Sequence, residues 1–450
     1  MIGTGVFLKT RAMTCNVGTP LMVFAVWIAG GLLVLAGTFC YAEVGSLMPE
    51  AGGQYVFVRR AFGRLTGFML GWATFAIYVA AAQAALAVGF AIFLNVALGG
   101  VLDADVVRFS AGGATLHLSW LTMAALAAIW VIAAFNCRPV ASGGRVSLVL
   151  TVIKILVVVG ISAGALTFAT GSFTHLTLSG SSGTCADIAA SARGGVAGFG
   201  AAMLGALWAY DGWNNVAPLV GEMKDPVRNV PRVFFIGTVT VGSLYVLANV
   251  AYFYVLTPTE IASIPTSSSV ATEVMRRFLG HQAVVLVSVV LMVSSLGALF
   301  ASVLANSRIP FAMAREGLFF RRVAVVSPRT HVPVNAVLTQ AGWSSVLAVS
   351  GSYDVLTDAS IFAVWIIYGL SAGSIFVFRR TMPDAHRPYR AFGYPWIPAI
   401  FVVATAGLIV NTVIATPRMA GVGILFMLAG LPFYAWWSRA GQAAPPAGAG

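Results

Sequence analysis

The sequence predicts an all-α protein that crosses a membrane many times. Of its 450 residues, 59% are hydrophobic and only 9% are charged, whereas soluble domains carry about 25% charged residues. Apolar stretches of about 20 residues, long enough to span the hydrocarbon core of a bilayer, also recur along the whole chain. We therefore expect one transmembrane domain over residues 1–440, followed by a disordered Ala-, Pro- and Gly-rich tail over 441–450.

The apolar windows predict eleven full spans and a half span at residues 1–15. The loops between these windows are mostly short, so we expect no separate soluble domain. In chain order, the full spans are predicted at residues 19–47, 66–99, 119–137, 146–169, 194–220, 231–256, 282–306, 333–350, 355–378, 394–416 and 419–438.

The basic residues predict the orientation of these spans. If the loop 48–65 is cytoplasmic, most of the 26 Lys and Arg residues fall in cytoplasmic segments, as the positive-inside rule requires. This distribution predicts the orientation, and we expect a multi-pass integral protein of the plasma (inner) membrane. It also accounts for the net charge of +12 without a nucleic-acid partner.

The span at 194–220 contains polar residues that predict a broken helix. Gly212 can open the helix, Asp211 brings a carboxylate, and Asn214 and Asn215 follow within the same turn. Backbone that is not helical survives at this depth only where it lines a cavity or finds partners in the protein. Opposed helix ends at such a break would suit a zwitterion. The alternative is a kinked helix whose polar side chains only pack against neighbouring spans.

The chain opens on a Gly-rich turn that is a second candidate break. Gly3, Thr4 and Gly5 have no apolar run ahead of them, so residues 1–15 are expected to form only the second half of a span. As the start of a half-helix, this turn would direct backbone N–H groups at an anion. A plain N-terminal tail is the alternative.

Lys154 is a charge within a span and needs an explanation. Its side chain either snorkels to the cytoplasmic surface or forms a fixed cation facing the broken helices, where it would bind freed carbonyl groups. Ser294 and Ser295 lie in a later span. They are expected to hydrogen-bond either Lys154 or, more commonly, the backbone of their own helix.

The sequence shows no pattern that favours an enzyme, a cofactor or a metal site. No phosphate loop, dinucleotide fingerprint or metalloprotease helix occurs in the context that it requires. The four Cys residues have no metal-ligand spacing. Cys15 and Cys185 are both predicted outside and could pair, but two unpaired small hydrophobic side chains are the favoured interpretation.

Several motifs occur in order along the chain. They are Ile2-Gly3-Thr4-Gly5-Val6-Phe7, Trp208-Ala209-Tyr210-Asp211-Gly212-Trp213-Asn214-Asn215, Glu222-Met223-Lys224-Asp225-Pro226, Asn306-Ser307-Arg308 with Ala314-Arg315-Glu316-Gly317, Pro333-Val334-Asn335-Ala336, and Arg387-Pro388-Tyr389 with Gly393-Tyr394-Pro395. With these motifs the chain, from Ile2 to Trp437, resembles the amino acid–polyamine–organocation permeases, most closely their L-type amino acid transporter branch.

The resemblance implies an inverted-repeat transporter fold of 5+5 helices plus two, in which the first half of helix 1 is missing here. It implies a secondary transporter that moves amino acids by alternating access, as a sodium-independent exchanger of neutral L-amino acids. The substrate is expected at the two breaks, with Trp208 as the gate and Lys154, Ser294 and Ser295 in the place of a coupling cation. The implied substrate-binding residues are Ile2, Gly3, Thr4, Gly5, Trp208, Ala209, Tyr210, Asp211 and Gly212.

Two departures from the family limit what the resemblance implies. Phe300 stands where several relatives carry a polar residue, so substrate preference is not borrowed from them. The predicted outside loop 99–119 has no Cys, so we expect no disulfide-linked ancillary subunit. A proton-coupled amino acid or polyamine uptake permease remains an alternative, as does a membrane sensor that binds an amino acid without moving it.

Overall fold

The computed structural model of the protein describes residues 1–111, 114–179, 183–185, 188–265, 268–350, 353–415 and 417–442. Within these ranges the regular structure is almost entirely helical. The predicted tail 441–450 lies outside the described residues, apart from 441 and 442, which belong to the last helix.

The helices are labelled α, and the short 3₁₀ or π-helical turns are labelled η. In chain order they are α1 Gly5–Val17, α2 Pro20–Leu47, α3 Gln54–Phe62, α4 Arg64–Ala73, η1 Thr74–Val79, α5 Ala80–Ala97, η2 Val101–Asp103, α6 Trp120–Asn136, α7 Val140–Phe168, η3 Phe173–Thr177, η4 Ala190–Ala192, α8 Gly195–Tyr210, η5 Trp213–Glu222, α9 Pro226–Val255, α10 Pro258–Ala262, α11 Val270–Leu279, η6 Gly280–Gln282, α12 Ala283–Asn306, α13 Arg308–Arg315, η7 Arg321–Ala324, α14 Val334–Ser350, α15 Tyr353–Thr381, α16 Trp396–Ala415, α17 Pro417–Leu428 and α18 Gly430–Gln442.

One β-hairpin is added to the predicted all-α fold within the described residues. Strands β1 (Asp105–Ala111) and β2 (Ala114–Ser119) pair antiparallel between α5 and α6. Apolar and polar residues alternate in this stretch, with Val107 and Phe109 on either side of Arg108, and such alternation favours a strand. The windows used to find membrane spans are too long to detect an element of this length.

Seven helical stretches of the described residues are long and apolar enough to cross a membrane. They are Pro20–Leu47, Arg64–Ala97, Gly144–Phe168, Pro226–Val255, Ala283–Arg315, Trp396–Ile414 and Ala420–Arg439. The other predicted spans correspond to α6, α14, α15 and the pair α8 and η5. The total of eleven spans stays a prediction.

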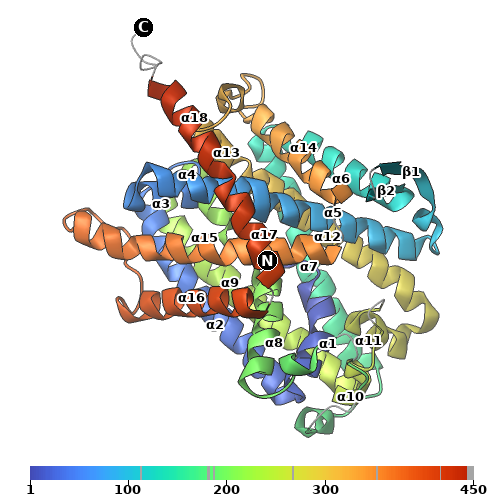
Figure 1. The fold of residues 1–450 in the computed structure, drawn as a ribbon. Coiled ribbons are helices and arrows are strands. Elements are labelled where there is room, and N and C mark those ends of the chain that lie inside the picture. The colour runs from blue at the N-terminus through green and yellow to red at the C-terminus, as the bar shows by residue number, and fades with distance from the viewer. Residues whose placement is uncertain are drawn as a thin grey trace.

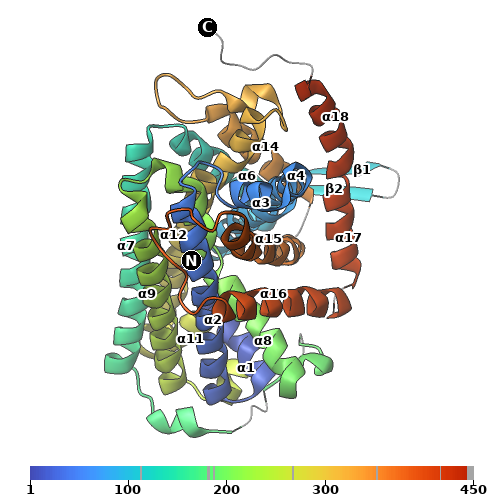
Figure 2. The same ribbon diagram turned by 90° about the vertical axis from the view of Figure 1, so that its left-hand side faces the viewer.

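The helices enclose the N-terminal turn. α1 packs against α8, α2 runs along α9, and α5 contacts α6, α12, α14 and α15. The N-terminus lies in the middle of the molecule in two perpendicular views (Figures 1 and 2), and α17 and α18 run along one edge in the second view (Figure 2). The first residues of the chain are therefore surrounded by helices from both halves of the sequence.

Two ion pairs, each with one buried member, join segments on the predicted cytoplasmic side. Arg308 is 1% exposed and donates from Nε and Nη2 to both carboxylate oxygens of Glu222, at 2.8 and 3.1 Å. Glu43 accepts in the same way from Arg379, at 2.8 and 2.7 Å, and lies 3.4 Å from Arg387. Removing the more exposed partner, Glu222 or Arg379, would weaken the compensation of a buried charge on Arg308 or Glu43, so we expect both pairs to be required for folding.

Cys15 and Cys185 form a disulfide, with their Cα atoms 5.8 Å apart. The favoured prediction of two unpaired cysteines is therefore wrong. The loop ahead of α8 folds back on the end of α1, because the Asn16 side chain donates to the Ala192 carbonyl and the Gly194 N–H donates to the Asn16 carbonyl, each at 2.7 Å. This backbone contact brings the two cysteines together.

Candidate functional site

The predicted break in the 194–220 span lies at Asp211 and Gly212. α8 ends at Tyr210, Asp211 is extended, and Gly212 adopts a φ of 87° before the 3₁₀ helix η5 begins at Trp213. A positive φ of this size favours glycine, which has no Cβ to clash with the backbone. The break therefore follows directly from the residue that the sequence supplies there.

The N-terminal turn lies against this break. Gly5 begins α1, and a Cβ added to Gly5 would lie 2.4 Å from the Cβ of Ala209 and 2.6 Å from its Cα. α1 and α8 can approach this closely only because residue 5 has no side chain. A Cβ added to Gly3 would meet only the Met1 carbonyl oxygen, at 3.9 Å. Packing therefore does not require a glycine at residue 3.

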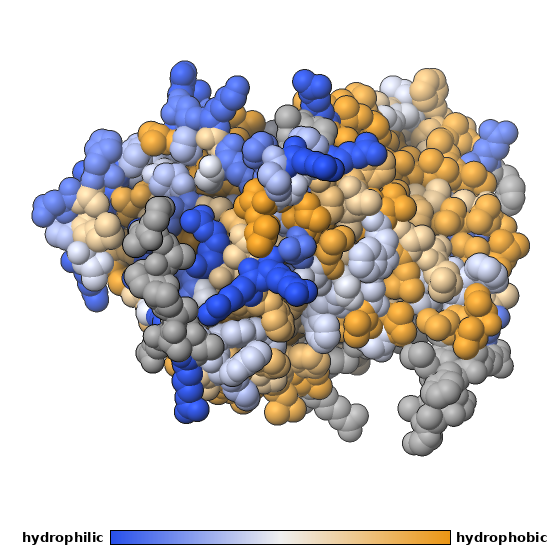
Figure 3. All heavy atoms as spheres, turned by 90° about the horizontal axis from the view of Figure 1, so that it is seen from above, coloured by the Kyte–Doolittle hydropathy of each residue, from blue (hydrophilic) through white to orange (hydrophobic). Residues whose placement is uncertain are grey.

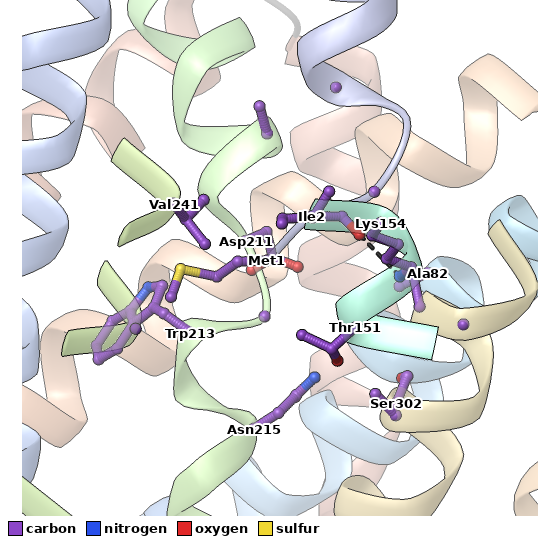
Figure 4. Close-up of a pocket in the computed structure, with 18 of the residues that line it drawn as sticks. Met1, Ile2, Ala82, Thr151, Lys154, Asp211, Trp213, Asn215, Val241 and Ser302 are labelled. Atoms are coloured by element: carbon purple, nitrogen blue, oxygen red, sulfur yellow. Dashed lines mark hydrogen bonds between the residues drawn. The ribbon is translucent and has the colours of Figure 1, made fainter. Parts of the chain in front are cut away.

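Lys154 reaches the N-terminal turn from α7. Its side chain is buried, at 8% exposed, and its Nζ donates to the Ile2 carbonyl oxygen at 2.8 Å (Figure 4). This geometry does not fit a side chain that snorkels to the membrane surface. Gly297 of α12 leaves room for the lysine, since a Cβ there would lie 2.7 Å from Cε and 3.1 Å from Nζ. No feature of the sequence had indicated that Gly297 makes room for Lys154.

Two further hydroxyl groups bind carbonyls of the broken segments. Ser294 donates to the Gly3 carbonyl at 3.0 Å, which is neither of the two partners expected for it, and Tyr245 donates to the Ala209 carbonyl at 2.7 Å. The Ser295 hydroxyl makes no hydrogen bond to any described residue. Side chains of α9 and α12 thus replace the hydrogen bonds that the breaks leave open.

Asp211 is held by two tyrosines that sequence reasoning missed. The Tyr368 hydroxyl donates to an Asp211 carboxylate oxygen at 2.5 Å and lies 2.9 Å from the Asn214 side-chain oxygen. The Tyr78 hydroxyl lies 3.2 Å from both carboxylate oxygens. Tyr78 belongs to η1, a π-helical turn between α4 and α5, and such turns occur often at functional sites. No sequence signal identifies either tyrosine, because aromatic residues are common in membrane spans.

Residues of the N-terminal turn and of the break at Asp211, together with Lys154 and Tyr78, line a cavity of about 440 Å³. Such a volume lies in the usual range for small-molecule sites, about 300–1,000 Å³. Figure 4 shows Lys154, Ile2, Asp211 and Asn215 around it. Of the predicted site residues, those that line it are Ile2, Gly3, Thr4, Gly5, Lys154, the half-buried Trp208, Ala209, Asp211 and Gly212.

Three predicted site residues do not line this cavity. Tyr210 is buried and donates its hydroxyl to the Trp27 carbonyl at 3.1 Å, so its ring packs against α2. Ser294 and Ser295 lie behind the N-terminal turn and are not among the lining residues. Asn215 lines the cavity, although it was not among the predicted binding residues, and it accepts a hydrogen bond from Asn306 at 3.0 Å.

The comparison with known families identifies the chain. Residues 1–437 match the family described as amino acid permease. The chain belongs to this family. It is an amino acid transporter of the amino acid–polyamine–organocation superfamily and a multi-pass integral membrane protein, not an enzyme. The resemblance inferred from the motifs is confirmed.

Curated relatives of this permease match over nearly its whole length. The serine/threonine exchanger SteT of Bacillus subtilis is 29% identical over 437 residues, which cover 96% of this chain and 92% of the relative. The b(0,+)-type amino acid transporter 1 of Mus musculus is 27% identical, covering 96% and 84%. The large neutral amino acids transporter small subunit 2 of the same species is 28% identical, covering 96% and 77%.

A second cavity of the permease, of about 1250 Å³, meets the same turn from the predicted outer side. It shares Thr4 and Gly5 with the first cavity, which we call the inner cavity, and it extends past α10 and α11. Glu260 lines this second cavity. Burial raises the pKa of its carboxyl group, but hydrogen bonds from Thr257 and the ion pair with Arg277 outweigh burial, so the pKa is lower than usual. The N-terminal turn therefore separates two cavities.

Phe300 lines neither cavity of the permease. It is 2% exposed and packs within a cluster of apolar side chains from α5, α6, α12 and α14. Its difference from the family pattern therefore lies in helix packing, away from the described cavities.

Proposed function

We propose that this permease exchanges neutral L-amino acids without sodium, by alternating access. The observation that carries the proposal is the buried ammonium group of Lys154, which donates to the Ile2 carbonyl at the wall of the inner cavity. A fixed positive charge at the carbonyls of a broken helix does the work that a bound cation would do. The names of two relatives, a serine/threonine exchanger and a large neutral amino acids transporter, support exchange and a neutral substrate.

In this proposal the substrate carboxylate binds at the start of α1. The first N–H groups of a helix have no partners within the helix and carry its positive end, and Gly5 begins α1 at the cavity wall. Ile2, Gly3 and Thr4 complete this turn. Gly3 also lines the cavity, and a Cβ there would meet no atom closer than 3.9 Å, so its lack of a side chain lets a ligand approach the backbone closely.

The α-amino group binds at the end of α8 in this proposal. Trp208, Ala209 and Tyr210 form the last turn of that helix, where carbonyl oxygens and the negative end of the helix favour a cation. The Asp211 carboxylate lies next to this turn and adds negative charge to the same wall. Tyr210 would contribute through its backbone, because its side chain packs against α2.

The proposed fold has two inverted repeats. α1, α2, the α4–η1–α5 stretch, α6 and α7 would form the first, and α8 with η5, α9, α12, α14 and α15 the second, leaving α16 and the α17–α18 pair as extra helices. Each repeat then begins with an interrupted helix, and the two interruptions touch. Two cavities that meet at Thr4 and Gly5 suit alternating access, with Trp208 as the gate toward the outside.

Uptake of labelled neutral amino acids into proteoliposomes in sodium-free buffer tests this function. An exchanger takes up label only when the vesicles contain amino acid. Label that accumulates in empty vesicles under a pH gradient would instead establish a proton-coupled permease. Binding of the amino acid with no flux in either arrangement would identify a sensor.

A further inference from the structure

A separate cavity of about 510 Å³ lies on the protein surface, away from the substrate site. It is formed by η7 and the first turns of α14, on the side that the charge distribution predicts to be cytoplasmic. Seen from above relative to Figure 1, hydrophilic residues gather over one part of the molecular surface and hydrophobic residues cover the part beside it (Figure 3). The lining residues are Phe320, Arg321, Arg322, Val323, Asn335, Leu338 and Thr339.

Two arginines give this cavity a positive charge with no internal partner. The side chains of Arg321 and Arg322 are exposed, and neither guanidinium makes a hydrogen bond or an ion pair with any described residue. The lining contains no acidic residue. The Asn335 side chain donates to the Arg322 carbonyl at 2.7 Å and so holds η7 against the start of α14. The backbone that carries the two arginines is therefore held next to the start of α14.

An apolar track leads from the cavity along α14. Leu338, Gly342 and Val346 follow at intervals of four residues and so share one face of the helix. Leu338 is 40% and Val346 53% exposed, and a Cβ added to Gly342 would meet no atom within 4 Å. The glycine thus forms a shallow notch between two exposed apolar side chains. Leu338 joins this track to the cavity, because it also lines the cavity.

We propose that this cavity binds an anionic phospholipid of the cytoplasmic leaflet. The phosphate would lie between Arg321 and Arg322, whose planar guanidinium groups suit bidentate phosphate binding. An acyl chain would follow Leu338, Gly342 and Val346 into the hydrocarbon. Basic pockets at the cytoplasmic ends of membrane helices bind acidic headgroups in this way. The proposal is independent of the transported substrate, because no residue of this cavity lines the inner cavity.

The test is a titration of the detergent-purified permease with phosphatidylglycerol, in which the lipid-bound fraction is measured by native mass spectrometry. The double variant Arg321→Gln with Arg322→Gln should bind phosphatidylglycerol about 30-fold more weakly, which corresponds to about 2 kcal/mol. Each single variant should lose about fivefold. Phosphatidylcholine should bind equally weakly to the wild type and the double variant.

A matched control has the same loss of charge elsewhere on the cytoplasmic side. Arg228 and Arg232 of α9 are exposed and line no described cavity, so Arg228→Gln with Arg232→Gln should bind phosphatidylglycerol as the wild type does. Equal losses in the two double variants would show a non-specific charge effect and overturn the proposal. Competition of inorganic phosphate with the lipid at equal concentration would also overturn the proposal, because the cavity would then be a site for free anions.

Discussion

Replacing Gly297 with alanine should detach Lys154 from the broken helices while leaving every charge in place. The new Cβ would lie 2.7 Å from Cε and 3.1 Å from Nζ of Lys154, whereas non-bonded carbon atoms pack at about 3.5–4.0 Å. The lysine must therefore move by about 1 Å, which stretches its 2.8 Å bond to the Ile2 carbonyl beyond about 3.5 Å, where a hydrogen bond is lost. A charge-assisted hydrogen bond contributes about 1.5–3 kcal/mol.

This loss predicts that Gly297→Ala lowers the rate of amino acid exchange by about 10- to 150-fold, at about 1.4 kcal/mol per factor of ten. The assay is the initial rate of exchange in proteoliposomes that contain equal amounts of protein. Gly160→Ala is the matched control, because Gly160 lies on the same helix as Lys154 and has no atom within 4 Å of an added Cβ. A wild-type exchange rate in Gly297→Ala would refute the reasoning.

Three other substitutions test separate contacts. Tyr368→Phe removes a donor to the buried carboxylate and should lower the thermal stability by about 1.5–3 kcal/mol; an unchanged melting temperature would contradict this. Gly5→Ala should destabilise the protein by about 1–3 kcal/mol through overpacking, whereas Gly3→Ala should not, and equal effects would show that the close helix approach is unimportant. Cys15→Ser with Cys185→Ser opens a loop with a sequence separation of 170 residues and should lower stability by about 2–4 kcal/mol; unaltered unfolding by heat would contradict this.

The sequence predicted the helices well because the bilayer fixes their length and composition. The windows at 231–256 and 282–306 correspond to α9 (Pro226–Val255) and α12 (Ala283–Asn306). The elements outside these windows were missed: β1 and β2 are too short for a hydropathy window, and so are α10 and α11. The disulfide between Cys15 and Cys185 was only the less favoured alternative, because the pairing depends on how a loop folds back on α1.

The candidate site was predictable only where a residue is unusual for a membrane span. Lys154 and Asp211 stand out because charges within a span are costly, and Gly212 stands out because it accompanies Asp211. Tyr78, Tyr368 and Gly297 do not stand out, since aromatic residues and glycines are frequent in transmembrane helices. Their roles depend on which helix faces meet, and the order of residues within one span does not give that information.

The central claim is that Lys154 takes the place of a coupling cation at the broken helices. The most direct test measures exchange of a labelled neutral amino acid by the wild type and by Lys154→Ala, each in sodium chloride and in choline chloride. We expect the wild-type rate to be the same in both salts, and exchange by Lys154→Ala to be strongly reduced in choline chloride. A wild type that needs sodium, or a Lys154→Ala variant that exchanges at the wild-type rate in choline chloride, would contradict the claim.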